Sequence, residues 1–458
     1  MGKSVLIIDH TLLKTNNSKQ LFESTFNEEF FCFSNKVARS YDSETFSSNE
    51  IFQNLIQRFL ALEFFVDKSA PCTIKVKDNI ELALYAKDIS TERQIPFEGS
   101  TLFSKIRLWV NYQTDILASA FFLSYLMIRI PWTKESVDKS CDFAVVRTKA
   151  ARSKLGKFDF VIEDENPYAK SSIYRLFSIK KRLKWVLLAW LKSYSVIKQR
   201  KQYIKKAVGT ESSFWLYHFY KKRLVHTLLY EQLMEEFLRQ QTGKTFYTAN
   251  NLDRYSVIEE IIAKKYGLNT ICIPHGIAYG FRFPKGFSCD TFYTYCKYSA
   301  SYFNKLYDTN KFVYDEGIAG KMLKSRKSTM YQGGKVVYFS EPREPEVNKQ
   351  IIEDLLPILK EKGLRLNIKF HPGDIRKEYS GYDIDVIEDL DEAISNNICF
   401  ARKSTTLLEA AFSGSSAAAI LLNEKDKNIF YSFPSLQAEK IKVTNSVDEL
   451  AEWIFGLV

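Results

Sequence analysis

The sequence lacks the cysteine and histidine spacings that are typical of disulfide frameworks and metal sites. Its seven cysteines are scattered and include no Cys-x-x-Cys pair, and none of its five histidines has a metal-ligand spacing to another. Such a pattern is typical of reduced thiols in a cytoplasmic protein rather than of a secreted disulfide scaffold or a zinc site. We therefore expect a cytoplasmic protein with no bound metal and no cofactor.

Long hydrophobic runs are also missing. The apolar start at Val5–Ile8 ends in an acid, Asp9, so it predicts a first β-strand rather than a signal peptide. The segment from Ile116 to Ile128 is uncharged but has only 13 residues. This is short of the roughly 20 residues that cross a bilayer, so the segment predicts a buried core helix.

The bulk composition is that of a globular protein. Hydrophobic residues make up 45% and charged residues 26% of the 458 positions. A chain of this length exceeds what one hydrophobic core usually supports, so we expect two lobes with a ligand cleft.

Positive charge is concentrated in one segment, 174–206. The formal net charge is +11, and this segment holds eleven Lys and Arg and no acid, so elsewhere basic and acidic residues balance at 54 each. Phe, Trp, Leu and Tyr are interleaved with the charges, which suits a helix at an anionic membrane surface, on the inner face of the cytoplasmic membrane, although the two classes do not separate cleanly on a helical wheel. A solvated basic helix packed on its own lobe is the alternative. Nucleic acid is not expected, because no zinc-finger, RNP or helix-turn-helix pattern accompanies the segment.

The order of elements in the last third predicts an α/β fold. Apolar strands at 335–339, 366–370, 398–401 and 417–422 alternate with helical segments, which indicates a parallel, doubly wound sheet with ligand-binding loops at the carboxyl ends of its strands. A polar, glycine-containing stretch at 324–334 precedes this series. We therefore predict an N-terminal domain over 1–325, with the basic aromatic insertion at 174–206, and a C-terminal domain over 335–458.

Two of these strand ends carry donor-side candidates. His371 leaves the end of the strand 366–370, and Pro372 fixes the turn after it, so the imidazole is aimed at the ligand face and can donate to a phosphate oxygen. Ser340 occupies the turn after the strand 335–339 and joins this set. A capped strand end is the alternative for His371.

A third strand end combines hydroxyl groups with the start of a helix. Ser404, Thr405 and Thr406 follow Lys403 there, and free backbone N–H groups and the helix dipole favour an anion such as a phosphate ester. An ordinary Ser/Thr helix cap is the alternative. Glu409, one turn into the helix, is either a contact to a ribose hydroxyl or a solvated helix residue.

Together these segments resemble the donor-binding half of GT-B transferases that build bacterial surface polysaccharides. The likeness covers the last 125 residues and is closest to sialyltransferases and polysialyltransferases, whose pattern is an acidic pair, then His-Pro, then Ser-Ser or Ser-Thr. It implies two Rossmann-like lobes facing across a cleft. It further implies that His371 with Pro372, and Ser404 with Thr405, hold the phosphate of a CMP-sugar without a metal.

The acidic pair of that family corresponds to Glu163 and Asp164. They end an apolar strand, but Glu165 follows where the family usually has glycine. The resemblance implies that Asp164 is the general base for the acceptor hydroxyl. Because three adjacent acids repel one another, we expect at least one of their pKa values to be raised.

A competing base is His275, which follows an apolar strand and begins the glycine-containing loop 275–280. This segment resembles the His-Gly segment of CDP-glycerol and CDP-ribitol phosphotransferases and of some capsule Kdo transferases. The resemblance makes His275 either catalytic or a residue that shapes the acceptor loop.

Four functions follow from these observations. The first is an enzyme that moves a CMP-activated acidic sugar, of the sialic, nonulosonic or Kdo class, onto a glycan or lipid-linked glycan of capsule, O-antigen or lipooligosaccharide. The second is a CDP-polyol phosphotransferase, and the third is a non-catalytic scaffold of a polysaccharide assembly complex. A UDP-sugar 2-epimerase is less favoured, because the basic segment has no purpose in it.

Overall fold

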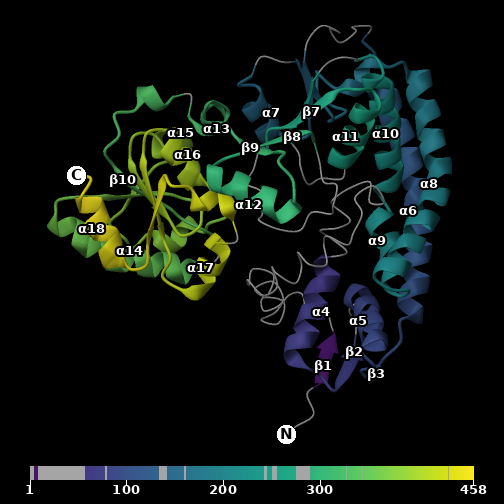
Figure 1. Cartoon of the computed structure of the whole chain (residues 1–458), viewed down its shortest axis with the longest axis horizontal. Coiled ribbons are helices and arrows are strands. Elements are labelled where there is room, and N and C mark those ends of the chain that lie inside the picture. Colours follow the sequence, from purple (N-terminus) through teal and green to yellow (C-terminus); the bar gives the residue numbers. More distant parts are fainter. Residues whose placement is uncertain are drawn as a thin grey trace. The chain divides into compact units, whose positions relative to one another are not determined.

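The computed structural model describes residues 5–8, 57–77, 80–133, 142–158, 161–241, 245–249, 255–274, 289–325, 327–342, 344–431 and 433–458. Two compact units divide the described chain: residues before Tyr293 form the first, and Tyr293–Val458 form the second (Figure 1). Each contains a parallel sheet flanked by helices, so the α/β prediction is confirmed. That the two lobes face each other across a cleft stays a prediction.

The second unit is built on six strands in the order β12-β11-β10-β13-β14-β15. Every neighbouring pair is parallel. The inner strands are buried on both faces, which is why their sequences are nearly continuous apolar runs. The strands are β10 (Val336–Phe339), β11 (Leu366–Lys369), β12 (Asp385–Val386), β13 (Ile398–Ala401), β14 (Ser416–Ile420) and β15 (Ile441–Thr444).

Helices connect these strands in the way their sequences predict. α14 starts at a proline and buries one apolar face on the sheet, and Gly363, at φ +69°, ends its turn. At the start of α18 the N-cap Ser446 accepts from the Glu449 N–H, and the Glu449 side chain accepts from the N–H of Asn445, the residue before the cap. The helices are α14 (Pro345–Glu361), α15 (Leu390–Ala393), α16 (Thr406–Phe412), α17 (Glu424–Tyr431) and α18 (Val447–Phe455).

Numbered along the chain, the six strands of this sheet lie in the order 3-2-1-4-5-6, which is the Rossmann order. The chain reverses its direction of winding between β10 and β13. In open parallel sheets a crevice forms at this reversal, outside the carboxyl ends of the two strands. The fold therefore puts the segments after Phe339 and Ala401 where a ligand site is expected.

A second six-stranded sheet has the order β5-β4-β6-β7-β8-β9, with winding reversed between β4 and β6. Strands β4 to β7 belong to the first unit, the unit boundary at Tyr293 falls within β8, and β9 belongs to the second unit. The pairs of β4 with β5 and β6, and of β7 with β6 and β8, are parallel. The strands are β4 (Phe143–Val146), β5 (Val161–Asp164), β6 (Thr245–Thr248), β7 (Asn269–Cys272), β8 (Thr291–Thr294) and β9 (Phe312–Tyr314). Its helices are α6 (Leu102–Arg129), α7 (Lys149–Leu155), α8 (Ile179–Ala207), α9 (Trp215–Tyr220), α10 (Leu224–Leu238) and α11 (Ser256–Lys265).

A small parallel sheet completes the described part of the first unit. The predicted first strand, Val5–Ile8, is confirmed as β1, and it pairs with β2 (Thr73–Val76), which pairs with β3 (Phe97–Glu98). Helices α4 (Gln57–Ser69) and α5 (Ile80–Glu92) accompany these strands.

The domain boundary has two descriptions in the structure. By strand order the second sheet begins at Val336, just after the predicted linker 324–334. By compactness the second unit begins at Tyr293, so it also contains α12 (Lys297–Tyr307) and α13 (Glu316–Leu323). The domains predicted over 1–325 and 335–458 remain a prediction about folding units.

The helix predicted at 116–128 is confirmed, but it is buried on one face only and not all round. This segment belongs to α6, a helix of 28 residues that buries one face, including Ile116 and Met127, and exposes the other. Phe121 and Phe122 on that face are 70% and 57% exposed. Within the described residues, none of the helices combines the length and the apolar character needed to traverse a bilayer.

Candidate functional site

Three loops meet at the carboxyl edge of the second sheet. Ser340 follows β10, His371 lies two residues beyond β11, and Ser404 lies three residues beyond β13. Because β10 pairs with both β11 and β13 in parallel, their carboxyl ends lie on the same edge. The structure thus brings the predicted donor segments to one edge of the sheet; Ser340 and Ser404 flank the reversal between β10 and β13, and His371 lies one strand away, after β11.

Hydrogen bonds fix the turn that carries His371. Asp374 Oδ2 accepts from the Ser340 hydroxyl at 2.5 Å and from the His371 N–H at 2.9 Å. The His371 backbone N–H also donates to the Ser340 hydroxyl oxygen at 3.2 Å, and Ser340 is only 4% exposed. Ser340 is therefore buried and holds the turn by hydrogen bonds. Its predicted contact with the donor substrate stays a prediction.

The His371 side chain is exposed and has a defined tautomer when neutral. Its Nδ1 accepts from the Gly373 N–H at 3.0 Å, so the neutral ring carries its proton on Nε2, the donor atom that a phosphate oxygen needs. A Cβ at Gly373 would lie 3.3 Å from that Nδ1 and 3.4 Å from Pro342, which shows how closely the turn packs on the loop after β10. Pro372, within the turn, is exposed.

A buried ion cluster lies under the loop after β13. Arg402 has no exposed surface, and its guanidinium bonds both oxygens of Asp426 at 2.6 and 2.8 Å and Glu344 at 2.7 Å. Burial alone raises the pKa of Asp426, but the hydrogen bonds and charges of Arg402 and Lys403 outweigh it and hold that pKa below its ordinary value. Glu344 itself has a left-handed backbone, with φ at +59°.

Lys403 belongs to this cluster rather than to the exposed surface. Its side chain is 8% exposed, and its ammonium group pairs with Asp426 and, at 3.2 Å, with Glu341. Its backbone N–H donates to Glu341 at 2.7 Å. Its observed partners are therefore carboxylates of the protein, and its predicted role in donor binding is not tested.

Hydroxyl groups at the start of α16 remain open to solvent. Ser404 Oγ donates to Thr406 Oγ1 at 3.1 Å and accepts from the Thr406 N–H at 3.3 Å. Thr405 is the exposed N-cap residue, and its side chain makes no cap hydrogen bond, so the alternative of an ordinary Ser/Thr cap is not seen at Thr405. Glu409 lies half-buried one turn further along.

The loop after β10 connects the two donor segments. Ser340 touches His371 on one side, and Glu341 accepts from the Lys403 N–H on the other. Neither His371 nor the 404–406 segment is sealed in apolar packing. An anion at this edge would therefore meet an imidazole donor and hydroxyl groups held by one hydrogen-bonded loop.

A second polar centre lies in the first unit, at the end of β5. Asp164 is bound by Arg152 at 2.6 and 3.2 Å and by the Ser171 hydroxyl at 2.6 Å. For the neighbouring Glu163, burial raises the pKa to about 7; Arg152 lowers it and the charge of Asp164 raises it. The expectation of a raised pKa among these acids is confirmed, and it falls on Glu163.

Several residues of this centre have no pattern in the sequence that predicts them. His226 on α10 lies between the hydroxyls of Tyr174 and Tyr255, at 3.3 and 3.2 Å, and 3.4 Å from a Glu165 carboxylate oxygen. Arg147, which directly follows β4, forms a buried ion pair with Glu259 of α11. His275 lies outside the described residues.

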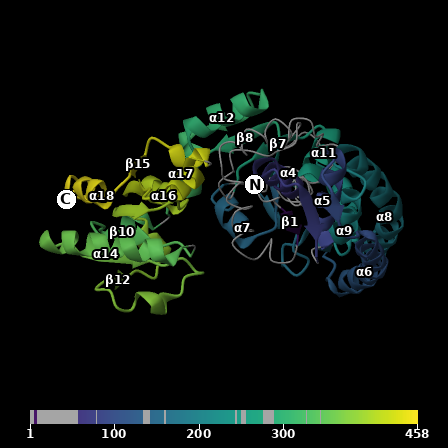
Figure 2. The same ribbon diagram turned by 90° about the horizontal axis from the view of Figure 1, so that it is seen from below.

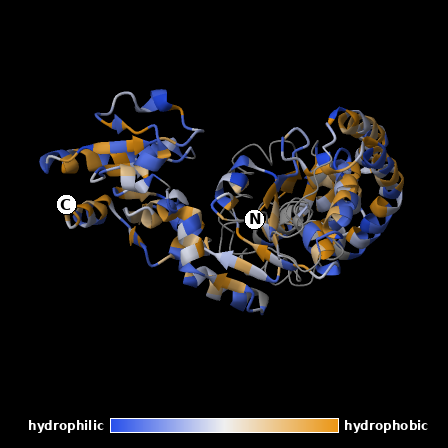
Figure 3. Cartoon of the chain, turned by 90° about the horizontal axis from the view of Figure 1, so that it is seen from above, coloured by the Kyte–Doolittle hydropathy of each residue, from blue (hydrophilic) through white to orange (hydrophobic). Residues whose placement is uncertain are grey.

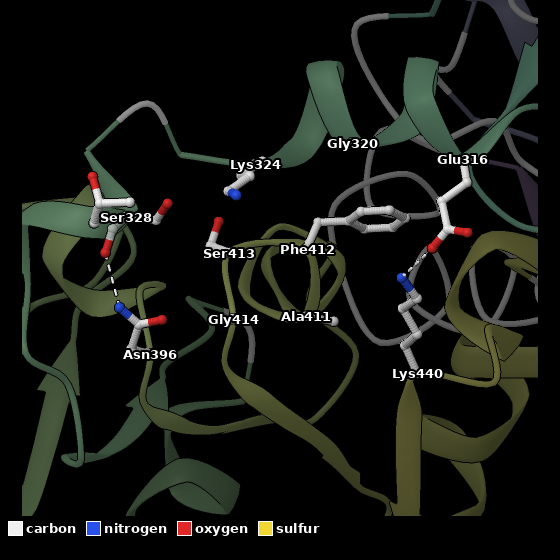
Figure 4. A pocket seen from close by; sticks show the side chains of 11 residues that line it. Glu316, Gly320, Lys324, Ser328, Asn396, Ala411, Phe412, Ser413, Gly414 and Lys440 are labelled. Atoms are coloured by element: carbon white, nitrogen blue, oxygen red, sulfur yellow. Dashed lines mark hydrogen bonds and ion pairs between the residues drawn. The ribbon is translucent and has the colours of Figure 1, made fainter.

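An open cavity of about 430 Å³ lies at the opposite edge of the second sheet. Figure 4 shows Asn396 and Gly414, which precede β13 and β14, and Lys440, which precedes β15 and forms an ion pair with Glu316 at 2.9 Å. Because these residues precede their strands, the cavity is at the amino-terminal edge. It is separate from the edge that carries His371 and Ser404.

The strand order and the polar loops define the second unit as a Rossmann-type α/β unit. No family model and no curated protein matches the chain. Among solved structures, the UDP-GlcNAc 2-epimerase of Methanocaldococcus jannaschii, in complex with UDP-GlcNAc and UDP, is similar with a TM-score of 0.33 and 10% sequence identity. The match covers 69% of this chain and 91% of the epimerase chain. A likeness of this size carries no information about activity.

Removing one partner of the buried ion cluster should destabilise the second unit. We expect Asp426→Asn to lower its free energy of unfolding by about 3–5 kcal/mol, because the buried Arg402 and Lys403 both lose the carboxylate they share, and Arg402 keeps only its pair with Glu344. The exposed pair of Arg365 and Asp385 supplies the control, since Asp385→Asn should cost less than about 1 kcal/mol. Urea unfolding of both variants makes the comparison, and equal losses would contradict the role of the cluster.

The raised pKa of Glu163 predicts a pH-dependent stability. Because the folded pKa is near 7 and the ordinary value is 4.5, the stabilising contribution is complete below pH 4.5 and is lost as the pH rises through 7. Glu163→Gln stays neutral, so its thermal midpoint should rise relative to the wild type between pH 5 and pH 8. Exposed Glu452→Gln is the control, and parallel curves for wild type and Glu163→Gln would refute the prediction.

Proposed function

We propose that the second unit binds the phosphate of a nucleotide-activated sugar on the loops after β10, β11 and β13. The observation that supports this proposal is that the loop after β10 hydrogen-bonds to the His371 turn on one side and to the segment before Ser404 on the other, at the carboxyl edge of a Rossmann-ordered sheet. His371 would donate through Nε2, and Ser404 and Thr405 through hydroxyl and backbone N–H groups.

The reaction class proposed is metal-independent glycosyl transfer by a GT-B enzyme. When a glycosidic phosphate leaves, negative charge develops on its oxygens, and donors already held in place stabilise that charge most effectively. The hydrogen bonds among Ser340, Asp374 and His371 support such a fixed donor. The resemblance of these segments to sialyltransferases makes a CMP-activated acidic sugar the proposed donor and a glycan or lipid-linked glycan the acceptor.

For the base, the geometry favours Glu163 over Asp164. Arg152 and Ser171 occupy the Asp164 carboxylate, whereas the pKa of Glu163 is raised to about 7, which suits proton abstraction at neutral pH. Asp164 then has a positioning role through Arg152. A CDP-polyol phosphotransferase that uses His275 is the second candidate, and it rests on the sequence resemblance of that loop. A scaffold function and a cytoplasmic location also stay predictions.

Nucleotide binding tests the donor site. A ligand at about 100 times its Kd stabilises the native state by about 2.7 kcal/mol. Because CMP is the nucleotide of the proposed donor, we expect it to raise the thermal midpoint of the full chain more than CDP, UDP or GDP does. The shift should disappear in His371→Ala and in the double variant Ser404→Ala/Thr405→Ala. Thr329→Ala, an exposed threonine at the opposite edge, should keep it.

Two outcomes would count against this proposal. A stronger shift with UDP would contradict the CMP-sugar assignment but leave the site in place. A CMP shift that survives in both site variants would contradict the site itself.

Turnover tests the base. With CMP-sialic acid as donor, Glu163→Gln should lower kcat for CMP release by about 10²- to 10⁴-fold. The wild-type rate should fall below pH 7, because Glu163 becomes protonated there. A variant of Glu163 with the wild-type rate and pH profile would assign the proton transfer to another residue.

A further inference from the structure

The outer face of α6 carries exposed apolar residues near both ends of the helix, with the exposed polar residues Asn111 and Thr114 between them. Its exposed large apolar residues recur at helical spacing, and the opposite face packs into the core. At 28 residues the helix is about 42 Å long. The residues exposed by 44–73% are Leu102, Phe103, Ile106, Trp109, Val110, Leu117, Phe121, Phe122, Tyr125 and Ile128.

This amount of exposed apolar surface needs a covering partner. Single exposed apolar residues are normal, but a helix face with so many of them marks an interaction surface. The other exposed residues of α6 are the basic Arg107 and Arg129 and the neutral Asn111, Thr114 and Ala118, while its acid, Asp115, is half-buried. The outer face is therefore mainly apolar, with positive charge and without an exposed carboxylate.

α8 adds a second exposed face with the same character. Leu187, Leu191 and Tyr194 are 53%, 53% and 42% exposed, and their spacing of three or four residues puts them on one side of the helix. The same spacing continues to Lys180 and Lys184 before them and to Lys198 after them. One exposed stripe thus has apolar residues at its centre and lysines at both ends.

The α8 lysines are largely uncommitted within the described residues. Lys192 pairs with Glu231 at 3.1 Å and Lys181 with Glu236 at 2.7 Å. Lys180, Lys184 and Lys198 are exposed and form no ion pair with any described residue. Their charges are therefore available to an anionic partner.

α6 and α8 pack against each other, so the two faces belong to one region of the first unit (Figures 1 and 2). Figure 3 shows hydrophobic and hydrophilic residues mixed along these outer helices. We name this surface, formed by the exposed residues of α6 and α8 given above, the α6–α8 face.

We infer that the α6–α8 face docks on the surface of an anionic lipid bilayer. Aromatic residues such as Trp109 and Tyr125 suit the boundary between headgroups and acyl chains, and long lysine side chains reach the anionic headgroups while their stems stay apolar. A second copy of the chain fits less well, because a two-fold contact would bring the same positive charges together. The inference goes beyond the proposed function and does not depend on it.

Co-sedimentation of the full chain with vesicles tests this inference. With vesicles containing 30% phosphatidylglycerol in phosphatidylcholine, most of the protein should pellet, and pure phosphatidylcholine should retain at least about tenfold less. Phe121→Ser/Phe122→Ser should reduce binding to the anionic vesicles at least about tenfold by removing apolar insertion. Lys184→Glu/Lys198→Glu should do the same by reversing charge.

Matched controls separate docking from misfolding. Met330→Ser removes an apolar side chain that is 75% exposed in the second unit, and it should bind vesicles as the wild type does. All variants should keep the wild-type thermal midpoint. Polar substitutions at positions as exposed as 121 and 122 remove little buried surface, so folding is expected to survive.

Three results would overturn the inference. The first is a wild-type chain that stays in the supernatant with anionic vesicles. The second is vesicle binding that is equal in the wild type and in both α6–α8 variants. The third is a wild-type dimer in analytical ultracentrifugation that Phe121→Ser/Phe122→Ser converts to monomer without any vesicle binding, which would assign the face to a second copy.

Discussion

Parallel pairing of β10 with both β11 and β13 is the constraint on which the candidate donor site depends. It places three strand ends side by side, and the winding of the sheet reverses between β10 and β13, where open parallel sheets form a crevice. Polar loops can then approach one another without burying unpaired backbone groups. The apolar strands of 4 residues each supply only the platform, and the chemistry lies in the residues that follow them.

The charged and polar residues at this edge form a buried group and an exposed group, and the two groups have different roles. Arg402, Asp426 and Glu344 are buried and satisfy one another, so they hold the loops in place. His371 and Thr405 are exposed and have donor capacity that the protein does not use up. Because the buried ion cluster holds the loops in place, the exposed donors would need little rearrangement to bind a phosphate.

The sequence predicted the second sheet well, because each strand is a short apolar run followed by a turn or a polar loop. The positions of His371 and Ser404 at strand ends followed from the same pattern. The ion cluster could not be predicted, because Asp426 is 24 residues from Arg402 and only the folded chain brings them together. His226 was missed for the same reason, since its partners lie on separate elements.

The helix α6 shows that composition alone does not predict which face of a helix is buried. An uncharged segment of 13 residues is equally compatible with a core and with an exposed apolar face, and only the packing of the neighbouring helices decides which side is covered. Asp164 shows a related limit. Its place at the end of a strand was evident, whereas its hydrogen bonds with Arg152 and Ser171 were not.

The most direct measurement of the central claim is the NMR spectrum of the His371 imidazole during a titration with CMP. The account predicts that the Nε2 resonance, assigned by comparison with His371→Ala, shifts as the ring donates to the phosphate, while Nδ1 keeps its hydrogen bond from Gly373. An Nε2 resonance that stays unchanged at CMP concentrations that saturate the protein would contradict it.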